Sequence, residues 1–229
     1  MKVALITAAG RGIGAGVARE LNQRGYQLGL LSPSESVTRL GDELGGIGIQ
    51  GSVLEKTDLK RLVEEALARW GRIDAVVNHT GHPPKGDLLE IRAEDWQRGH
   101  DMVLTPVIEM ARLVTPAMLK QGAGAFVNIT TFAAYEPSLI FPVSCTYRAA
   151  VGAFTRLYAD RYAAQGLRMN AVLPGFTDSL NHKPETIASI PMKRVASVSE
   201  IAKSVAFLLS DDASYITGHA VTSSDKSIT

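Results

Sequence analysis

Apolar residues along this chain alternate between two spacings, and the alternation predicts strands that are each followed by a helix. Short apolar runs rich in branched residues are typical of strands buried on both faces. Such runs lie at residues 3–6, 27–31, 47–53, 73–77, 125–129, 167–173 and 220–222. Apolar residues three and four apart predict helices around 17–21, 35–44, 58–70, 93–120, 144–165 and 199–209. This order predicts an α/β fold, a doubly wound parallel sheet in three layers within a single domain spanning 1–229.

The longest helical pattern, over residues 93–120, contains two prolines. Pro106 and Pro116 both fall inside it. Proline removes a backbone donor and collides with the preceding turn, so we expect a kink or two separate helices here.

The segment from Thr7 to Gly14 joins the first predicted strand to the first predicted helix. Its glycines at 10, 12 and 14 allow a sharp turn and a close approach of the backbone to a ligand. A helix N-terminus offers free N–H groups and a positive dipole end, so a pyrophosphate fits there. A tight turn in some other α/β protein is the alternative.

Composition excludes several classes of protein. The 229 residues are 45% apolar and 21% charged, with a net charge of +1. We therefore expect no nucleic-acid partner. No apolar run is expected to span a membrane, and the chain opens directly on a strand, so we expect no secretory leader and a cytoplasmic location. Cys145 is the single cysteine, and the histidines lack ligand spacing, so we expect neither a disulfide nor a metal site.

Four motifs in sequence order resemble the short-chain dehydrogenase/reductase family over nearly the whole chain. Residues 7–14 are similar to its Thr-Gly-x-x-x-Gly-x-Gly turn, with Ala8 in place of the first glycine. Residues 78–81, Asn-His-Thr-Gly, resemble its Asn-Asn-Ala-Gly, and 170–175 its Asn-x-x-x-Pro-Gly. Residues 207–218 are similar to its C-terminal region, whereas 223–226, Ser-Ser-Asp-Lys, depart from its closing Val-Asp-Gly-Gly. The resemblance implies a Rossmann fold, NAD(P)H binding and hydride transfer at a small carbonyl or alcohol substrate.

The family's catalytic positions are altered in this chain. In the family a tyrosine is the general acid/base, a lysine four residues later lowers its pKa, a serine holds the substrate oxygen and an asparagine supports a proton relay. Matching Arg148-Ala149-Ala150 to the family's Lys-Ala-Ala places Ser144 at the tyrosine. Thr131 then falls at the serine and Val103 at the asparagine. The resemblance makes Thr131, Ser144 and Arg148 the candidate catalytic residues.

These replacements remove the usual proton route. A phenol has a pKa near 10 that a neighbouring cation can lower, whereas a serine hydroxyl is a far weaker acid. Arginine keeps the positive charge but binds as a planar fork. Tyr147, Tyr135, His79 and His100 are alternative proton donors, each with a packing or surface role as the competing interpretation. Cys145 fits a buried helix residue better than a nucleophile.

Cofactor preference is indicated by three positions. The second strand ends at Ser32, without the acidic residue that would bind the adenosine ribose. Arg11 resembles the basic residue that NADP-preferring members place beside the 2′-phosphate. Ser52 replaces the family's adenine-contacting aspartate, which weakens adenine recognition. We expect NADP(H) ahead of NAD(H), with weak or absent binding as the alternative.

The candidate cofactor-binding residues follow from the resemblance and lie at the carboxyl ends of the predicted strands. They are Thr7, Gly10, Arg11, Gly12, Ile13, Gly14, Ser32, Ser52, Val53, Asn78, Gly81, Arg148, Pro174 and Gly175. Residues 176–197 are expected to form a lid over the substrate.

Three functions remain open from the sequence. The first is an NADP(H)-dependent oxidoreductase with a non-standard proton route. The second is a redox-inactive member that binds a small ligand or a partner. The third resembles the halohydrin dehalogenases, which carry an arginine like Arg148 but lose the glycine turn that this chain retains. A homodimer or homotetramer through the helices at 93–120 and 144–165 is expected, with Tyr158 and Tyr162 on the pairing faces.

Overall fold

Seven parallel strands form one sheet in the computed structural model, which describes residues 1–223. In chain order they are β1 (Val3–Thr7), β2 (Gln27–Ser32), β3 (Ile47–Gln50), β4 (Ala75–Asn78), β5 (Gly124–Ile129), β6 (Leu167–Pro174) and β7 (Ala220–Ser223). Their order across the sheet is β3-β2-β1-β4-β5-β6-β7. The expected doubly wound fold is therefore confirmed. The predicted departure from the family pattern at residues 224–226 lies outside the described residues.

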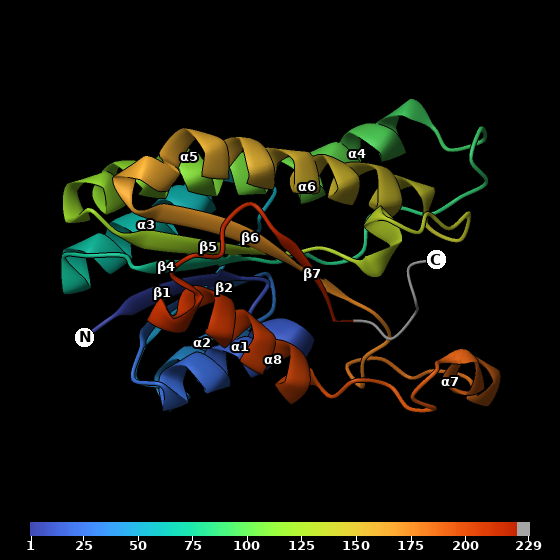
Figure 1. The fold of residues 1–229 in the computed structure, drawn as a ribbon, viewed down its shortest axis with the longest axis horizontal. Coiled ribbons are helices and arrows are strands. Elements are labelled where there is room, and N and C mark those ends of the chain that lie inside the picture. The colour runs from blue at the N-terminus through green and yellow to red at the C-terminus, as the bar shows by residue number, and fades with distance from the viewer. Residues whose placement is uncertain (224–229) are drawn as a thin grey trace.

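Helices cover both faces of this sheet, giving three layers (Figure 1). One face carries α1 (Gly12–Gln23), α2 (Ser36–Glu43) and α8 (Val198–Leu209). The other carries α3 (Lys56–Trp70), α4 (Ala93–Val103), α5 (Thr105–Gln121) and α6 (Pro142–Tyr162). Short 3-10 turns add η1 (Phe132–Ala134), η2 (Ala163–Gln165) and η3 (Asp211–Ala213). The helix predicted over 144–165 thus begins two residues earlier, as α6, and its last three residues form the 3-10 turn η2.

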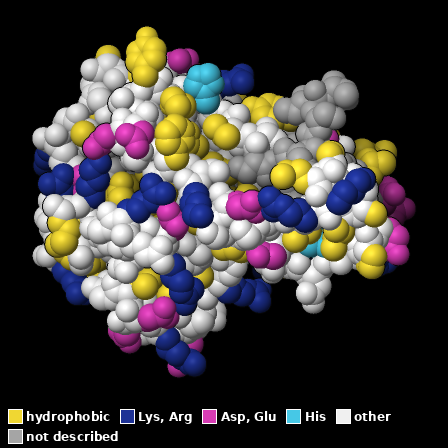
Figure 2. Space-filling model, turned by 60° about the horizontal axis from the view of Figure 1, so that its bottom comes forward, with side chains coloured by type: hydrophobic (Ala, Val, Ile, Leu, Met, Phe, Trp, Pro, Cys, Tyr) yellow, Lys and Arg dark blue, Asp and Glu magenta, His cyan; other side chains and the backbone are white. Residues whose placement is uncertain are grey.

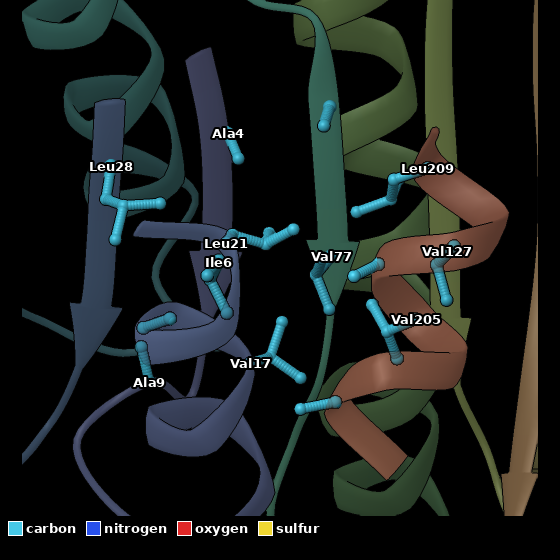
Figure 3. Packing of buried hydrophobic residues seen from close by; sticks show 14 of the residues in the cluster. Ala4, Ile6, Ala9, Val17, Leu21, Leu28, Val77, Val127, Val205 and Leu209 are labelled. Carbon is cyan, nitrogen blue, oxygen red and sulfur yellow. The ribbon is translucent and has the colours of Figure 1, made fainter. Parts of the chain in front are cut away.

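The core lies on both sides of the sheet, as the unbroken apolar strands require. All five residues of β1 are buried. Figure 3 shows Val17 and Leu21 of α1 and Val205 of α8 packed over the strands β1, β2, β4 and β5. Burying a side chain of this size stabilises the fold by about 1.5–3 kcal/mol. This packing fixes where α1 begins and so where the glycine turn lies.

The strand order reverses between β1 and β4. From β1 the chain adds β2 and β3 on one side, and from β4 it adds β5, β6 and β7 on the other. In such sheets a crevice opens at the carboxyl ends of the strands at this point. Residues 8–14, 78–81, 130–131 and 174–179 all follow strand ends at this edge. The edge lies on the right of Figure 1, where α7 (Pro184–Ser189) also lies. This short helix within the 176–197 segment was not predicted.

The third predicted strand is too long. β3 ends at Gln50, so Ser52 and Val53 lie in the turn that follows. The Ser52 backbone N–H donates to the Asp58 carboxylate at 2.9 Å, and the Leu54 N–H donates to the Ser52 hydroxyl oxygen at 3.1 Å. These bonds hold a turn where hydropathy alone continues a strand.

The long helical pattern divides as expected, into α4 and α5 on either side of Leu104. Pro106 lies in the first turn of α5, where a missing N–H costs nothing, and Pro116 lies inside it. Residues 93–121 include an 18-residue window with a mean hydropathy of 1.4, so by length and composition this stretch is a candidate membrane span, contrary to our expectation. Half of that window is buried, and α4 and α5 pack against α6 and α3. The stretch is therefore a pair of core helices.

Surface charges are mixed rather than separated by sign. On the face that Figure 2 presents, Lys and Arg side chains are interspersed with Asp and Glu. This distribution agrees with the net charge of +1 and leaves no broad basic patch on the face shown.

Two helical glycines differ in the space around them, which predicts opposite effects of alanine. A Cβ at Gly16 would lie 2.0 Å from Val198 Cγ1, whereas nothing lies within 4 Å of a Cβ at Gly152. Gly16→Ala therefore overpacks the contact of α1 with α8, and we expect it to lower the free energy of unfolding by about 2 kcal/mol. Gly152→Ala gains helix propensity and should raise the free energy of unfolding by about 0.5–1 kcal/mol. Urea denaturation of both variants measures this, and equal effects of the two would contradict the packing.

Candidate active site

The turn between β1 and α1 has a shape that only glycine permits. Gly12 has a φ of +55°, and a Cβ at Gly14 would lie 2.3 Å from the Ala8 carbonyl oxygen. Arg11 caps α1 without a side-chain hydrogen bond, and no side chain of residues 1–223 accepts from the N–H groups at the start of the helix. Ile13 lies in this first turn and packs on the core. The turn is suited to binding a phosphate.

Hydroxyl groups rather than carboxylates surround the end of β2. The Ser36 hydroxyl donates to the Gly10 carbonyl oxygen at 2.9 Å. A Cβ at Gly10 would lie 2.7 Å from the Ser32 hydroxyl oxygen. Arg11 is exposed beside this group. A ligand here meets one cation and several hydroxyls.

The Thr7 hydroxyl joins the ends of β1 and β4. It donates to the His79 carbonyl oxygen at 2.7 Å and accepts from the His79 backbone N–H at 2.8 Å. Thr7 is buried and both bonds are internal. Its structural role is to hold residues 78–81 beside the glycine turn, so it contributes to the site through their position.

A buried polar chain runs from β4 to α6. The Asn78 side-chain amide donates to Asn128 at 2.8 Å, and the Asn128 amide donates to the Thr155 hydroxyl at 2.9 Å. Asn128 and Thr155 were not predicted. The β4–β5 register places Asn78 opposite Asn128, so only a correct strand pairing could have identified the pair.

Three buried polar atoms beside this chain have no partner among the described residues. They are Asn78 Oδ1, His79 Nδ1 and Thr80 Oγ1. Burial, and to a smaller extent the positive charge of Arg148, lower the pKa of His79 to about 3. His79 is thus neutral at neutral pH, which removes it as a general acid.

Arg148 is the centre of the site's hydrogen bonding. Its guanidinium donates through Nη1 to the carbonyl oxygens of Ile129 at 2.8 Å and Thr130 at 3.3 Å. Nη2 donates to the Gly81 carbonyl oxygen at 3.2 Å, and Nε donates to the Ser144 hydroxyl oxygen at 3.1 Å. Arg148 is 6% exposed, and burial lowers its pKa to about 10. The side chain therefore joins β5, α6 and the 78–81 turn.

The other two altered positions are likewise structural. The Thr131 hydroxyl oxygen accepts from the Ala133 N–H at 3.4 Å and caps η1. Val103 packs in an apolar cluster with Val107 and Val151. No polar group stands at the position where the family relay has its asparagine.

The alternative proton donors do not take over the tyrosine's position. Tyr147 packs against α4, with its ring edge-on to Trp96 and His100. His100 contacts Asp101 at 3.0 Å on that same helix. Tyr135 is half-exposed on the flank of α6. None of these three side chains has a hydrogen bond to Arg148 or Ser144 among the described residues.

Cys145 has a packing role. It is buried, and its thiol donates to the Ser138 carbonyl oxygen at 3.7 Å while accepting from the Ser138 N–H at 3.4 Å. The cysteine therefore holds the 135–141 loop, as its buried-helix interpretation predicts.

The segment after Pro174 and Gly175 returns over the glycine turn. Thr177 forms a parallel bridge with Ala196, which closes the base of the 176–197 segment. A Cβ at Gly12 would lie 3.4 Å from Cβ of Ser179, whose hydroxyl lies 2.6 Å from that of Thr177. Ser179 and Thr177 were not among the predicted site residues. They lie close to where a phosphate would bind.

The structure thus brings most predicted site residues to one edge of the sheet. At or just after the carboxyl ends of β1, β2, β4 and β6 lie Thr7, the glycine turn, Ser32, Asn78, Gly81, Pro174 and Gly175. Ser52 and Val53 lie farther along, where the Ser52 side chain and N–H are used by its own turn. Within the described residues, no group of three acidic, histidine or cysteine side chains could hold a metal ion.

Comparison with known proteins gives matches over nearly the full chain. A family model described as enoyl-(acyl carrier protein) reductase matches residues 7–224. A 3-oxoacyl-[acyl-carrier-protein] reductase of Staphylococcus epidermidis is 31% identical, covering 96% of both chains. Oxidoreductase UcpA of Salmonella typhimurium is 32% identical, covering 95% of this chain and 90% of that protein.

Solved structures match as well. A 3-ketoacyl-(acyl-carrier-protein) reductase from Brucella melitensis, complexed with NADH, has a TM-score of 0.93 and 25% identity, covering 98% of this chain and 97% of that one. L-Sorbose reductase from Gluconobacter frateurii, complexed with NADPH and L-sorbose, has a TM-score of 0.92 and 23% identity, covering 99% and 97%. The second likeness concerns the fold alone.

The lowered pKa of His79 predicts an acid-sensitive fold. The unfolded chain takes up this proton near pH 6.5 and the folded chain only near pH 3, so the contribution to stability is complete above pH 6.5 and is lost as the pH falls. His79→Asn removes the titrating group and restores the amide expected from the family motif. Between pH 6.5 and 4 the wild type should lose about 3 kcal/mol more than this variant. Urea unfolding across that range measures the difference, and parallel curves would contradict it.

Proposed function

The chain belongs to the short-chain dehydrogenase/reductase family, and we propose that it binds NADP(H) while lacking that family's fast proton transfer. The proposal has two parts, one for each half of the dinucleotide. The nucleotide half rests on the glycine turn and its surroundings. The reactive half rests on the hydrogen bonds of Arg148.

The phosphate and adenosine end fits the residues present. Among residues 1–223 no side chain accepts from the N–H groups at the start of α1, and the cradle at Gly10 and Gly12 has room only because both lack a Cβ. These N–H groups would hold the pyrophosphate. Arg11 and Ser32 would meet the 2′-phosphate of NADP(H), which is why we place NADP(H) ahead of NAD(H). Complexes of the similar reductases with NADPH and NADH support a nicotinamide cofactor.

The reactive end has a different arrangement. The bound cofactor would supply a hydride, and the protein would have to supply or accept a proton at the substrate oxygen. Ser144 stands at the position of the family's phenol, and a serine hydroxyl is a poor acid at neutral pH. Arg148 donates its N–H groups to three carbonyl oxygens and to Ser144, so few donors remain for a ribose diol. This single arrangement carries the proposal of a redox-inactive, ligand-binding member.

One contact favours a second candidate, a slow oxidoreductase acting on a small carbonyl or alcohol. Nε of Arg148 donates to the Ser144 hydroxyl, which polarises that O–H toward a substrate oxygen. Thr131 supplies a second hydroxyl at the family's serine position. Solvent would then provide the proton, and Ser144→Ala would reduce whatever turnover exists. The dehalogenase alternative is disfavoured by the intact glycine turn.

A homodimer or homotetramer and a cytoplasmic location complete the proposal. Tyr158 is not a pairing residue, because it is 4% exposed and its hydroxyl lies 2.7 Å from that of Thr115. Exposed apolar side chains on α5 and α6 instead include Ile108, Leu119 and Leu157. Leu157 is 67% exposed, so we place the self-association on these two helices.

The self-association predicts that Leu157→Glu shifts the protein toward the monomer. A charge buried in an apolar contact loses its hydration without gaining a partner, so the contact should weaken at least tenfold. Sedimentation velocity of the wild type and the variant measures this. A wild-type monomer at 50 micromolar (roughly the concentration of a standard run) would contradict the assignment.

Arg11→Gln tests the cofactor assignment. It should weaken NADPH binding about tenfold and leave NADH binding unchanged, because only NADPH carries the 2′-phosphate that pairs with the guanidinium. Titration followed by cofactor fluorescence measures both affinities. Arg19→Gln is the matched control, since Arg19 lies on the same helix and pairs with Glu43. Equal loss of both cofactors, or no NADPH binding at all, would refute the proposal.

Ser144→Tyr combined with Arg148→Lys tests the proton route. Restoring both groups should raise NADPH-dependent reduction of an aldehyde panel by about 10²-fold or more, the usual contribution of general acid catalysis. Stopped-flow absorbance at the nicotinamide band measures the rate, and circular dichroism establishes that the variant is folded. The redox-inactive assignment fails if the wild type already turns over rapidly and Ser144→Ala leaves that rate unchanged.

A further inference from the structure

A cavity lies on the flank of α6, next to Thr130 and Leu173 at the ends of β5 and β6. It has a volume of about 190 Å³ and lies between α6, η1 and the strands β6 and β7. Arg148, Gly152 and Arg156 recur every four residues along α6, so they share the face that lines it. Ala171 of β6 and Ala220 of β7 line the cavity from the sheet. We call this space the lateral cavity.

The polar groups of the lateral cavity are cationic or neutral. Arg148 and Arg156 both line it, and no aspartate or glutamate among residues 1–223 does. Within residues 1–223, Arg156 has neither a hydrogen bond nor an ion pair, and the Tyr135 hydroxyl at the rim has no partner. Arg148 is buried, and all its hydrogen bonds in this part of the chain go to uncharged oxygens. The cavity thus gathers two guanidinium-bearing side chains and offers them no counter-charge.

An anion is the natural complement of this arrangement. Arg156 is exposed and has no partner among residues 1–223, so its guanidinium is free to pair with a bound anion. Arginine and a phenol together also recognise carboxylates well, because their donors converge on the two oxygens. The sheet side is lined by small apolar residues, which favours a ligand with an apolar body.

The size of the lateral cavity limits that ligand. An apolar cavity of about 150 Å³ holds a benzene molecule, so a slightly larger one holds a single ring with a small substituent. We propose that the lateral cavity is a binding site for a compact carboxylate with an apolar body, of the size of an aromatic acid. The carboxylate would lie between Arg156 and Tyr135, with the ring against Ala171 and Gly152.

The lateral cavity shares Thr130 and Arg148 with the candidate active site, but none of the residues assigned to the phosphates. The glycine turn, Ser32 and Ser179 do not line the lateral cavity. Binding of a carboxylate and of NADPH can therefore be measured independently, and the failure of one does not decide the other.

Calorimetric titration of the full chain with benzoate, and with benzamide as its uncharged counterpart, tests the proposal. Benzoate should bind with a dissociation constant below about 1 mM, and benzamide at least tenfold more weakly. Arg156→Met keeps the length of the side chain and removes its charge. It should weaken benzoate about tenfold and leave benzamide unchanged. Arg161→Met, on the same helix but outside the lining, is the matched control and should change neither.

Filling the cavity provides a second variant with an independent readout. A Cβ at Gly152 meets nothing within 4 Å, so Gly152→Leu should fold, occupy the space and abolish benzoate binding. Gly152→Ala should retain it, and both variants should keep wild-type NADPH titrations. Equal affinity for benzoate and benzamide, no saturation by 10 mM (roughly the limit of weak specific binding), or full binding by Gly152→Leu would each overturn the proposal. It is also overturned if Gly152→Leu instead dissociates an oligomer and benzoate does not bind, because a second copy then covers this face.

Discussion

The buried guanidinium of Arg148 holds together the parts of the molecule that decide its function. It donates to carbonyl oxygens at the end of β5 and in the 78–81 turn, and to Ser144 on its own helix. A buried charge is tolerable only when its donors are satisfied, and here uncharged oxygens satisfy them. A lysine ammonium at the same position would present a compact charge with three donors and could reach a ligand. The planar fork of arginine bridges backbone groups instead. A change of residue type at one position thus converts a ligand-facing cation into a structural one.

The consequence is a site whose two halves are independent. The phosphate-binding turn depends on glycines, on the packing of α1 beneath β1, and on the hydroxyls around β2, none of which involves Arg148. The reactive half depends on Ser144 and Arg148 of α6 and on Thr131 before η1, whose side chains form hydrogen bonds within the protein. The phosphate-binding turn can persist while the residues around Arg148 change. It is positioned by the same core that stabilises the sheet, and that core does not depend on Arg148 (Figure 3).

The sequence predicted the order of elements well because each strand is buried on both faces and each helix has one apolar face. Its glycine spacing located the turn after the first strand, and the resemblance to the family located the Ser144–Arg148 pair. It missed the end of β3, where the Asp58 carboxylate and the Ser52 N–H form a turn that hydropathy does not record. The Asn78–Asn128–Thr155 chain depends on strand register, and the environment of His79 on burial. The lateral cavity is created by segments far apart in the chain, so no local pattern could indicate it.

The most direct test of this account is the ¹⁵N NMR signal of Arg148 Nε–H in the free protein and with saturating NADPH. If the guanidinium is bound internally, its Nε–H should give a separate, slowly exchanging resonance near neutral pH that does not move when NADPH binds, because the fork remains on its carbonyl oxygens. A resonance that is absent through rapid exchange with water, or one that shifts strongly when NADPH is added, would show that Arg148 faces the ligand and would contradict the account.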